Sequence, residues 1–321
     1  MRSIEDKESK MLTFGPVPSR RLGRSLGINN ITFKHCSYSC VYCQIGRTTE
    51  YSVKRGGFYP PEKIYNDVLK SVKRAGKRGE KIDYLTFVAD GEPTLDVNLI
   101  KILNMIKTLG IKTAIISNSS LIWMDEVKRD LMNFDWVSLK CDSVDEHVWK
   151  KIDRPHGELA LKKILNGMVD FSHNYKGDLN IEVMLVKGVN DGGDNLKQLG
   201  QFLRRVKHNR IYLSVPTRPP AEKFVNKPDE MTVTKAYNIL GEKLKNVQLN
   251  IGFEGNEFSS TGDLENDILR ITAVHPMKID SVINLINREK GTLSIINKLK
   301  KEEKIKEIDY NGEKFIVRTL Y

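Results

Sequence analysis

The sequence predicts an α/β protein built on a parallel sheet, because short apolar runs alternate with segments of helical spacing along most of its 321 residues. Several apolar runs end directly in polar or glycine-containing turns, which is typical of parallel sheets that carry chemistry at the carboxyl ends of their strands. Beyond residue 256 this alternation stops. These observations allow either an open, partial barrel or a flat doubly wound sheet, followed by a small second domain.

Six apolar runs are expected to form the sheet, with helices between them. The strands are expected at residues 25–33, 84–88, 113–117, 136–140, 179–186 and 211–215. Helical spacing is clearest at residues 61–76, 99–109 and 159–171. Six βα units of this kind fit a partial barrel of the TIM type.

Composition and charge narrow the class of protein. No apolar run approaches the ~20 residues that a membrane span requires, and the charged N-terminus lacks the apolar core of an export signal. We therefore expect a cytoplasmic protein with no membrane partner, since sparse, clustered cysteines also suit a reducing compartment. The net charge of +11 favours anionic partners such as nucleic acid, although a lysine-rich solvated surface explains it equally well.

The most informative motif is a run of eight residues that contains three of the four cysteines, Cys36, Cys40 and Cys43. The spacing is C-x3-C-x2-C, with Tyr42 directly before the last cysteine. Soft thiolates gathered in one short loop suit an iron–sulfur cluster. Three thiolates leave one iron of such a cluster open to another ligand.

A zinc site is the main alternative for this loop, with the adjacent His35 as a fourth ligand. Zinc sites of this kind usually pair two cysteines with a second, distant pair, and only Cys141 remains elsewhere in the chain. A disulfide is a poor explanation, because three cysteines in one loop leave an odd one. The sequence therefore favours the cluster.

The cysteine loop and residues 91–94 (GEPT) together resemble the radical S-adenosylmethionine (radical SAM) enzymes, and the resemblance covers residues 15–215. It implies a partial (β/α)6 barrel, with a 4Fe–4S cluster on the three clustered cysteines and SAM on the open iron. One electron from a low-potential donor of the flavodoxin or ferredoxin type would cleave SAM. The resulting 5′-deoxyadenosyl radical would remove a hydrogen atom from the substrate.

The resemblance also assigns cofactor-binding roles to residues at the strand ends. These are Tyr42, Gly91, Glu92, Pro93, Ser117, Asn118, Lys140, Val186 and Asn190. A carboxylate and backbone carbonyls after the second strand suit the ammonium group of SAM, and glycine permits close approach. Asp90 stands where the family often has glycine, so its side chain is expected to point elsewhere. The alternatives are an ordinary turn after the second strand and a helix cap after the third.

Three arginines and one cysteine are candidates for contact with the substrate. Arg20 and Arg21 would bind phosphate at the barrel mouth, or instead anchor the N-terminal segment through backbone carbonyls. Arg218 follows the sixth strand and would hold an anionic substrate. A lone cysteine at a strand end, such as Cys141, is usually a small residue of the core. The alternative is that Cys141 donates a hydrogen atom inside the barrel.

The N-terminal run GPVPSRRLGRSLG at residues 15–27, followed by QIGR at residues 44–47, resembles an uncharacterised radical SAM subgroup. Some members of that subgroup are described as related to wyosine-base tRNA synthases. True wyosine synthases typically carry a second cluster. Because only Cys141 is left over, a second cluster is essentially excluded here.

The C-terminal segment is expected to form a second domain at residues 257–321, after a radical SAM core with its N-terminal extension at residues 1–256. A polar linker at 257–263 precedes helices at 264–273, 279–286 and 293–301, and a hairpin at 304–320 turns at Asn311-Gly312. This order resembles a winged-helix module. In the third helix, Leu293, Ile296 and Leu299 would pack inward while the lysines face a nucleic acid. The alternatives are that the module packs on the barrel or binds a protein.

Three functions follow from these observations. The first is modification of a tRNA or rRNA base, which the net charge and the winged-helix-like segment favour. The second is modification of a protein or peptide, including glycyl-radical activation, with the C-terminal domain as a docking module. The third is a redox-sensing DNA-binding protein. No oligomeric state is indicated by the sequence.

Overall fold

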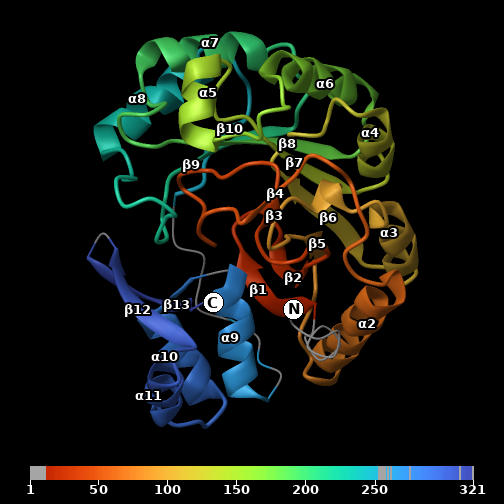
Figure 1. Ribbon diagram of the computed structural model, residues 1–321, viewed down its shortest axis with the longest axis vertical. Coiled ribbons are helices and arrows are strands. Elements are labelled where there is room, and N and C mark those ends of the chain that lie inside the picture. Colours follow the sequence, from red (N-terminus) through yellow and green to blue (C-terminus); the bar gives the residue numbers. More distant parts are fainter. Residues whose placement is uncertain are drawn as a thin grey trace.

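A computed structural model describes residues 12–251, 258, 260, 262–274, 276–310 and 312–319 of the protein (Figure 1). Its main feature is an open eight-stranded sheet in the order β1-β2-β5-β6-β7-β8-β9-β10. The strands are β1 (Thr13–Ser19), β2 (Gly23–Ile28), β5 (Tyr84–Phe87), β6 (Lys112–Ser117), β7 (Trp136–Lys140), β8 (Asp178–Met184), β9 (Arg210–Ser214) and β10 (Val247–Leu249). All neighbours from β2 to β10 are parallel, and β1 is antiparallel to β2. The six expected strands are confirmed.

Helices cover the outer face of the curved sheet (Figure 1). They are α2 (Pro61–Lys77), α3 (Leu99–Lys107), α4 (Asp125–Leu131), α5 (Glu146–Asp153), α6 (Leu161–Asn174), α7 (Gly193–Leu203) and α8 (Glu230–Gly241). Helix α2 begins with a proline at its first position, where no intrahelical donor is needed, and buries Ile64 and Val68. The apolar faces of the helices and the strands share one large core. None of the described helices is long and apolar enough to cross a membrane.

Strand β2 ends earlier than the sequence pattern predicts, at Ile28 rather than residue 33. The two asparagines that follow hold the turn after β5 instead of continuing the ladder. The Asn29 Oδ1 atom accepts the backbone N–H of Asp90 at 3.0 Å, and Asn30 Nδ2 donates to the Pro93 carbonyl at 3.0 Å. The chain then enters the cysteine loop, which contains the short parallel pair β3 (His35–Cys36) and β4 (Glu50–Tyr51) in the concave centre of the sheet (Figure 1).

Strand β1 was not predicted, because its prolines and glycine are atypical of strands. It pairs with β2 around a bulge between Phe14 and Val17. The Phe14 ring lies directly over Gly27, where a Cβ atom would stand 2.1 Å from the ring. Glycine is therefore required at this position in β2 for the hairpin to close.

The C-terminal segment has its own layer of helices on a small sheet. It comprises α9 (Leu264–Val274), β11 (Met277–Lys278), α10 (Ile279–Arg288), α11 (Ser294–Lys301), β12 (Ile305–Tyr310) and β13 (Glu313–Arg318), with antiparallel sheet order β11-β13-β12. The expected three helices and hairpin are present, and β11 adds a strand. Ile296 and Leu299 are buried as expected, but Leu293 is 51% exposed because it precedes α11 instead of facing its core.

Two features of this segment bear on the expected domain boundary. The boundary between residues 256 and 257, most of the linker and Asn311 of the hairpin turn lie outside the described residues. A separate hydrophobic core joins α9, α10, α11 and the small sheet to Val17 of β1. The hairpin also reaches the barrel, where the Tyr310 hydroxyl donates to the Pro216 carbonyl at 3.2 Å.

Replacing Gly27 with alanine tests the close approach of Phe14. We expect Gly27→Ala to lower the free energy of unfolding by about 1–3 kcal/mol, because the rigid ring must move away from the new methyl group. Urea denaturation of the metal-free protein measures this change. Gly76→Ala in α2, where a Cβ atom meets nothing within 4 Å, is the control and should be neutral or stabilising. A Gly27→Ala protein as stable as the wild type would contradict the close contact.

Candidate active site

A cavity of about 300 Å³ lies at the carboxyl ends of the parallel strands. Its wall includes the three thiols of the cysteine loop and polar residues that follow β5, β6 and β7. Of the predicted site residues, the structure places Cys36, Cys40, Cys43, Tyr42, Gly91, Glu92, Ser117, Asn118, Lys140, Arg20, Arg21 and Arg218 in this wall. Pro93, Val186, Asn190 and Cys141 are not among the lining residues.

The cysteine loop is held by backbone contacts to the neighbouring βα loops. The backbone N–H groups of Ser39 and Val41 donate to the carbonyls of Asp153 and Ile152, at 3.0 and 2.9 Å. The carbonyl of Cys36 accepts from Ser52 N at 3.1 Å. These bonds fix the loop between its own return segment and the end of α5, so the thiols project into the cavity.

The three thiols line one cavity, and the alternative zinc ligand does not line it with them. His35, the alternative zinc ligand, packs its ring edge-on against Phe58 with the centroids 4.8 Å apart. Burial and then the Glu92 carboxylate raise the pKa of Cys36 to about 12, so metal binding must displace a proton there.

Gly91 and Glu92 join the cysteine loop to the end of β5. A Cβ atom on Gly91 would lie 1.8 Å from the His35 carbonyl oxygen, and the Glu92 N–H donates to that oxygen at 3.2 Å. The Glu92 carboxylate is buried and accepts bonds from Ser117 Oγ at 2.8 Å and from Asn118 N at 2.7 Å. Burial raises the pKa of Glu92, and these hydrogen bonds oppose the rise. Glu92 thus ties β5 to β6 through both carboxylate oxygens.

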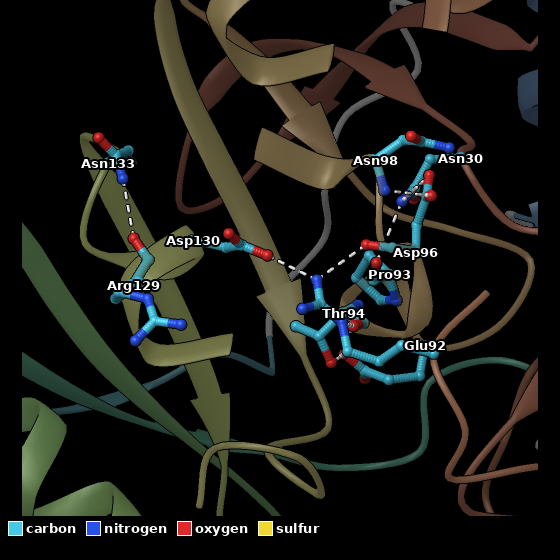
Figure 2. Close-up of polar contacts among 10 residues, drawn as sticks. Asn30, Glu92, Pro93, Thr94, Asp96, Asn98, Arg129, Asp130 and Asn133 are labelled. Carbon is cyan, nitrogen blue, oxygen red and sulfur yellow. Dashed lines mark hydrogen bonds and ion pairs between the residues drawn. The ribbon is translucent and has the colours of Figure 1, made fainter. Parts of the chain in front are cut away.

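Figure 2 shows how the turn after Glu92 is held. Thr94 turns back so that its N–H and its hydroxyl donate to Glu92 Oε1, at 3.1 and 2.6 Å. Asp96 accepts from Asn30 Nδ2 at 3.2 Å, and its carbonyl accepts from Arg55 at 2.9 Å. Pro93 belongs to this support: it is buried and begins the short 3-10 helix Pro93–Leu95.

A group of charges occupies the inner face of the sheet beside the cavity. Glu182 of β8 pairs with Arg21 and lies 3.6 Å from Lys140 Nζ. Burial alone would raise the pKa of Glu182, but Arg21 and Lys140 lower it to about 2. Lys140 Nζ lies 4.7 Å from the centre of the Tyr42 ring and has no hydrogen-bond partner among the described residues. This ammonium group can donate to a ligand in the cavity.

A second buried group lies behind the cysteine loop. The Tyr42 hydroxyl donates to Asp142 and, at 3.2 Å, to Asp153, which also accepts from Cys40 Sγ at 3.3 Å. Burial and then the Asp142 carboxylate raise the pKa of Asp153. Tyr42 therefore reaches past the loop with its hydroxyl, while its ring faces the cavity.

Arg20 and Arg21 occupy the β1–β2 turn, and both line the cavity. Arg20 donates to the carbonyl of Asn250, directly after β10, at 2.8 Å, as in the anchoring alternative. Arg21 pairs with Glu182 and lies over the rings of Trp136 and Tyr212. Binding of phosphate by the two arginines stays a prediction.

Cys141, Val186 and Asn190 have structural surroundings. Cys141 is 5% exposed within the main core, which agrees with the default interpretation of a core cysteine. Asn190 Oδ1 accepts from Val186 N at 2.8 Å, and its Nδ2 donates to the Asp142 carbonyl at 2.9 Å. Asn190 thus closes the turn after β8 and holds it against the end of β7.

Several residues of the site escaped sequence analysis. Glu182 occupies an inward position of β8. A carboxylate at an inward position of an otherwise apolar strand is unusual, and this feature of the sequence could have identified Glu182 as a site residue. Glu222 pairs with Arg47 at 2.8 Å and also with Arg154, which ties the cysteine loop to the segment after β9. Lys34 lines the cavity two residues before the first cysteine. No spacing rule links these residues, because they meet only in three dimensions.

Comparisons with known proteins identify the family and several relatives of this chain. Residues 30–200 match the Radical SAM superfamily. The UPF0026 protein MJ1312 of Methanocaldococcus jannaschii is 48% identical over 96% of both chains. A Brachyspira hyodysenteriae protein named GTPase Obg is 30% identical over 95% of this chain, which spans 45% of that longer protein. A probable dual-specificity RNA methyltransferase RlmN of Endomicrobium trichonymphae is 27% identical over 67% of this chain and 61% of its own.

Two solved structures share the fold. A radical SAM methyltransferase from Sphaerobacter thermophilus has a TM-score of 0.57 and 12% identity, over 71% of this chain and 66% of its own. TYW1 with a lysine–pyruvate adduct has a TM-score of 0.52 and 18% identity, over 68% of this chain and 73% of its own. The expected partial barrel is confirmed, and the flat doubly wound alternative is wrong.

Glutamine in place of Glu182 tests the charged group on the sheet. We expect Glu182→Gln to lower the free energy of unfolding at pH 7 by about 3–5 kcal/mol, because two buried cations lose their counter-charge. The folded-state pKa of about 2 lies below the ordinary 4.5, so the carboxylate stabilises the fold above about pH 4.5, and this contribution is lost toward pH 2. Urea unfolding of the metal-free protein between pH 7 and pH 3 should show a weaker acid dependence in the variant.

The control for this measurement is Glu146→Gln, which removes an exposed partner of Lys150. It should change stability by less than about 0.5 kcal/mol. Equal effects of the two substitutions would contradict the buried ion-pair group.

Substitution of single cysteines tests the metal-binding set. We expect Cys40→Ala, after anaerobic reconstitution with iron and sulfide, to lose the iron and the visible absorbance of a 4Fe–4S cluster. Cys141→Ala should retain both, because Cys141 lies outside the cavity wall. Loss of the cluster in the Cys141 variant, with the fold intact by circular dichroism, would refute this assignment.

Proposed function

From the premise that this chain belongs to the radical SAM superfamily and to its UPF0026 family, we propose that it modifies a base of tRNA or rRNA. As a radical SAM enzyme it uses a 4Fe–4S cluster and SAM, and it needs an electron donor. The observation that carries the proposal is a second cavity, of about 800 Å³, that continues from the first between the barrel and the C-terminal segment. We further propose a flavodoxin or ferredoxin as the donor.

The residues of the first cavity fit the two cofactors. Cys36, Cys40 and Cys43 would hold the cluster, and the backbone at Gly91 with Lys140 would face SAM. Bound together, the cofactors supply one-electron chemistry that removes a hydrogen atom from an unactivated C–H bond. The protein holds the substrate carbon in place and excludes water and other hydrogen donors.

Individual side chains have separate tasks in this proposal. Lys140, buried and aimed into the cavity, would donate to a carboxylate or a hydroxyl of SAM. Glu92 acts as a positioning residue, because its oxygens are engaged by Ser117 and Asn118. Asn118 is held so that its amide donates to Ser37 Oγ at 3.0 Å and lies 3.5 Å from Cys36 Sγ.

The size of the first cavity argues that the substrate binds beyond it. Ligand pockets of about 300–1,000 Å³ each hold one small molecule, and the first cavity is at the lower limit of that range. Residues 215–218 line both cavities, so the two cavities adjoin there. In our proposal a macromolecular substrate presents one group past these residues while its remainder lies in the larger cavity.

The larger cavity suits an unstacked nucleotide. The C-terminal segment contributes Tyr310 and Phe315, whose ring centres lie 6.5 Å apart, and the barrel contributes the apolar side chain of Leu249. The wall holds three cations, Arg218, Lys227 and Lys278, and three carboxylates, Asp229, Glu230 and Glu313, so its cations would contact phosphate only locally. Aromatic rings that stack bases and cations that contact phosphate are the usual means of binding single-stranded RNA. Two relatives, named an RNA methyltransferase and a nucleotide dehydratase, are consistent with a nucleotide substrate.

The basic helix α11 is less suited to nucleic acid than its sequence suggested. Lys298 pairs with Glu265 at 2.6 Å, and Lys304 pairs with the same glutamate at 3.1 Å. Lys300 pairs with Glu307. These carboxylates neutralise much of the positive charge near α11, so we place the RNA contact of the winged-helix-like segment on its cavity side. The same neutralisation removes the main support for a redox-sensing DNA-binding protein.

Modification of a peptide remains the second candidate, because β10 is an edge strand with an exposed side. Leu249 is 45% exposed and Ile251 is 38% exposed beside the larger cavity. An extended peptide could pair with this edge while its side chains contact the two residues. The C-terminal segment would then serve as the docking module.

The decisive measurement follows the abstracted hydrogen. Anaerobically reconstituted enzyme is incubated with SAM, dithionite and deuterated RNA or, separately, deuterated peptides. We expect deuterium to appear in 5′-deoxyadenosine with RNA. Deuterium from the peptide pool alone would overturn the proposal in favour of the second candidate. The cluster-free Cys40→Ala protein is the blank.

A variant of the larger cavity sharpens this measurement. Tyr310→Ala should lower kcat/KM for RNA roughly tenfold, because a stacked base contributes about 1–3 kcal/mol. Tyr237→Ala, at an exposed tyrosine on α8 outside the cavity wall, should have no effect. Equal activities of the two variants would remove the C-terminal segment from the substrate site.

A further inference from the structure

Lys34 occupies a position that the reaction outlined above does not use. It directly precedes β3, and its backbone has a left-handed φ of 59°, which is uncommon for a residue with a Cβ atom. The Lys34 N–H donates to the Asp90 carbonyl at 2.8 Å, and its carbonyl accepts from Thr49 and Glu50 at 3.3 and 3.1 Å. These bonds hold the backbone of Lys34 against both β5 and the return of the cysteine loop.

The side chain of Lys34 is directed by this backbone into the cluster site. The residue is 3% exposed, and its ammonium group donates to the Gly46 carbonyl and lies 3.8 Å from Cys43 Sγ. Among the described residues it makes no ion pair. A buried ammonium group without a counter-charge is costly, so the position calls for an anion. A cluster bound to Cys43 would supply one.

We propose that Lys34 is a fixed positive charge that makes the iron–sulfur cluster easier to reduce. When the external donor is oxidised by one electron, the cluster gains that electron and one unit of negative charge, and no bond or proton changes place. A cation beside a ligand sulfur stabilises the reduced cluster more than the oxidised one, because attraction grows with the negative charge. Charge and hydrogen bonds near the sulfurs are known levers on cluster potentials.

The competing explanation is that Lys34 only holds the loop through the Gly46 carbonyl. Three variants separate charge from hydrogen bonding. Lys34→Arg keeps the charge and a donor, Lys34→Gln keeps a donor without the charge, and Lys34→Met removes both. Lys54→Gln is the matched control: it removes one positive charge from the segment that follows the same loop, and that side chain is exposed and makes no ion pair among the described residues.

The test is a redox titration of each reconstituted full-length protein, followed by the electron paramagnetic resonance signal of the reduced cluster, without substrate. At a fixed potential we expect Lys34→Gln and Lys34→Met to lower the ratio of reduced to oxidised cluster at least tenfold, a shift of ~59 mV for one electron. Lys34→Arg and Lys54→Gln should stay within threefold of the wild type.

Each result decides for or against an effect of the Lys34 charge on the reduction of the cluster. A wild-type ratio in Lys34→Gln at full iron content would overturn the proposal, as would equal shifts in Lys34→Arg and Lys34→Gln. If the neutral variants fail to load iron while Lys34→Arg loads normally, the requirement for a cation is supported directly. Failure of all three to load would assign Lys34 to loop structure alone. The titration contains no RNA or peptide, so its outcome is independent of the proposed substrate.

Discussion

The contact between Gly91 and the His35 carbonyl is the constraint on which the rest of the site depends. The 1.8 Å separation that a Cβ atom would have from this oxygen means that the cysteine loop can rest on the end of β5 only if residue 91 is glycine. The next residue, Glu92, then spans to β6 through Ser117 and Asn118. A metal-binding loop and two strand ends are thereby held as one unit.

Sequence periodicity located the six central strands because each is a buried apolar run in a parallel sheet. It missed β1, whose Gly15, Pro16 and Pro18 are poor strand residues. Motif spacing gave the three thiols, since their loop is local in sequence. Glu182 reaches the site from a strand far away in the sequence, where it pairs with Arg21. Lys34 is near the cysteines in sequence, but its side chain enters the site only because of an unusual backbone angle. No local pattern could therefore identify either residue.

Ion pairs lower the positive charge where the sequence suggested a basic helix. The net charge of +11 suggested a basic face, and yet lysines around α11 pair with Glu265 and Glu307. Inside the barrel, Lys140 shares the carboxylate of Glu182 with Arg21, whereas Lys34 makes no ion pair among the described residues. Both ammonium groups line the same cavity, which is where a cofactor would meet them.

The β1–β2 turn fills one end of the barrel with side chains. Arg21 lies over the rings of Trp136 and Tyr212, and Leu22 packs against the same two residues. The three thiols lie toward the other end of the strands, where the cavity is lined by residues that follow β5, β6 and β9. The short N-terminal hairpin thus occupies the space inside the sheet that the cofactor site leaves.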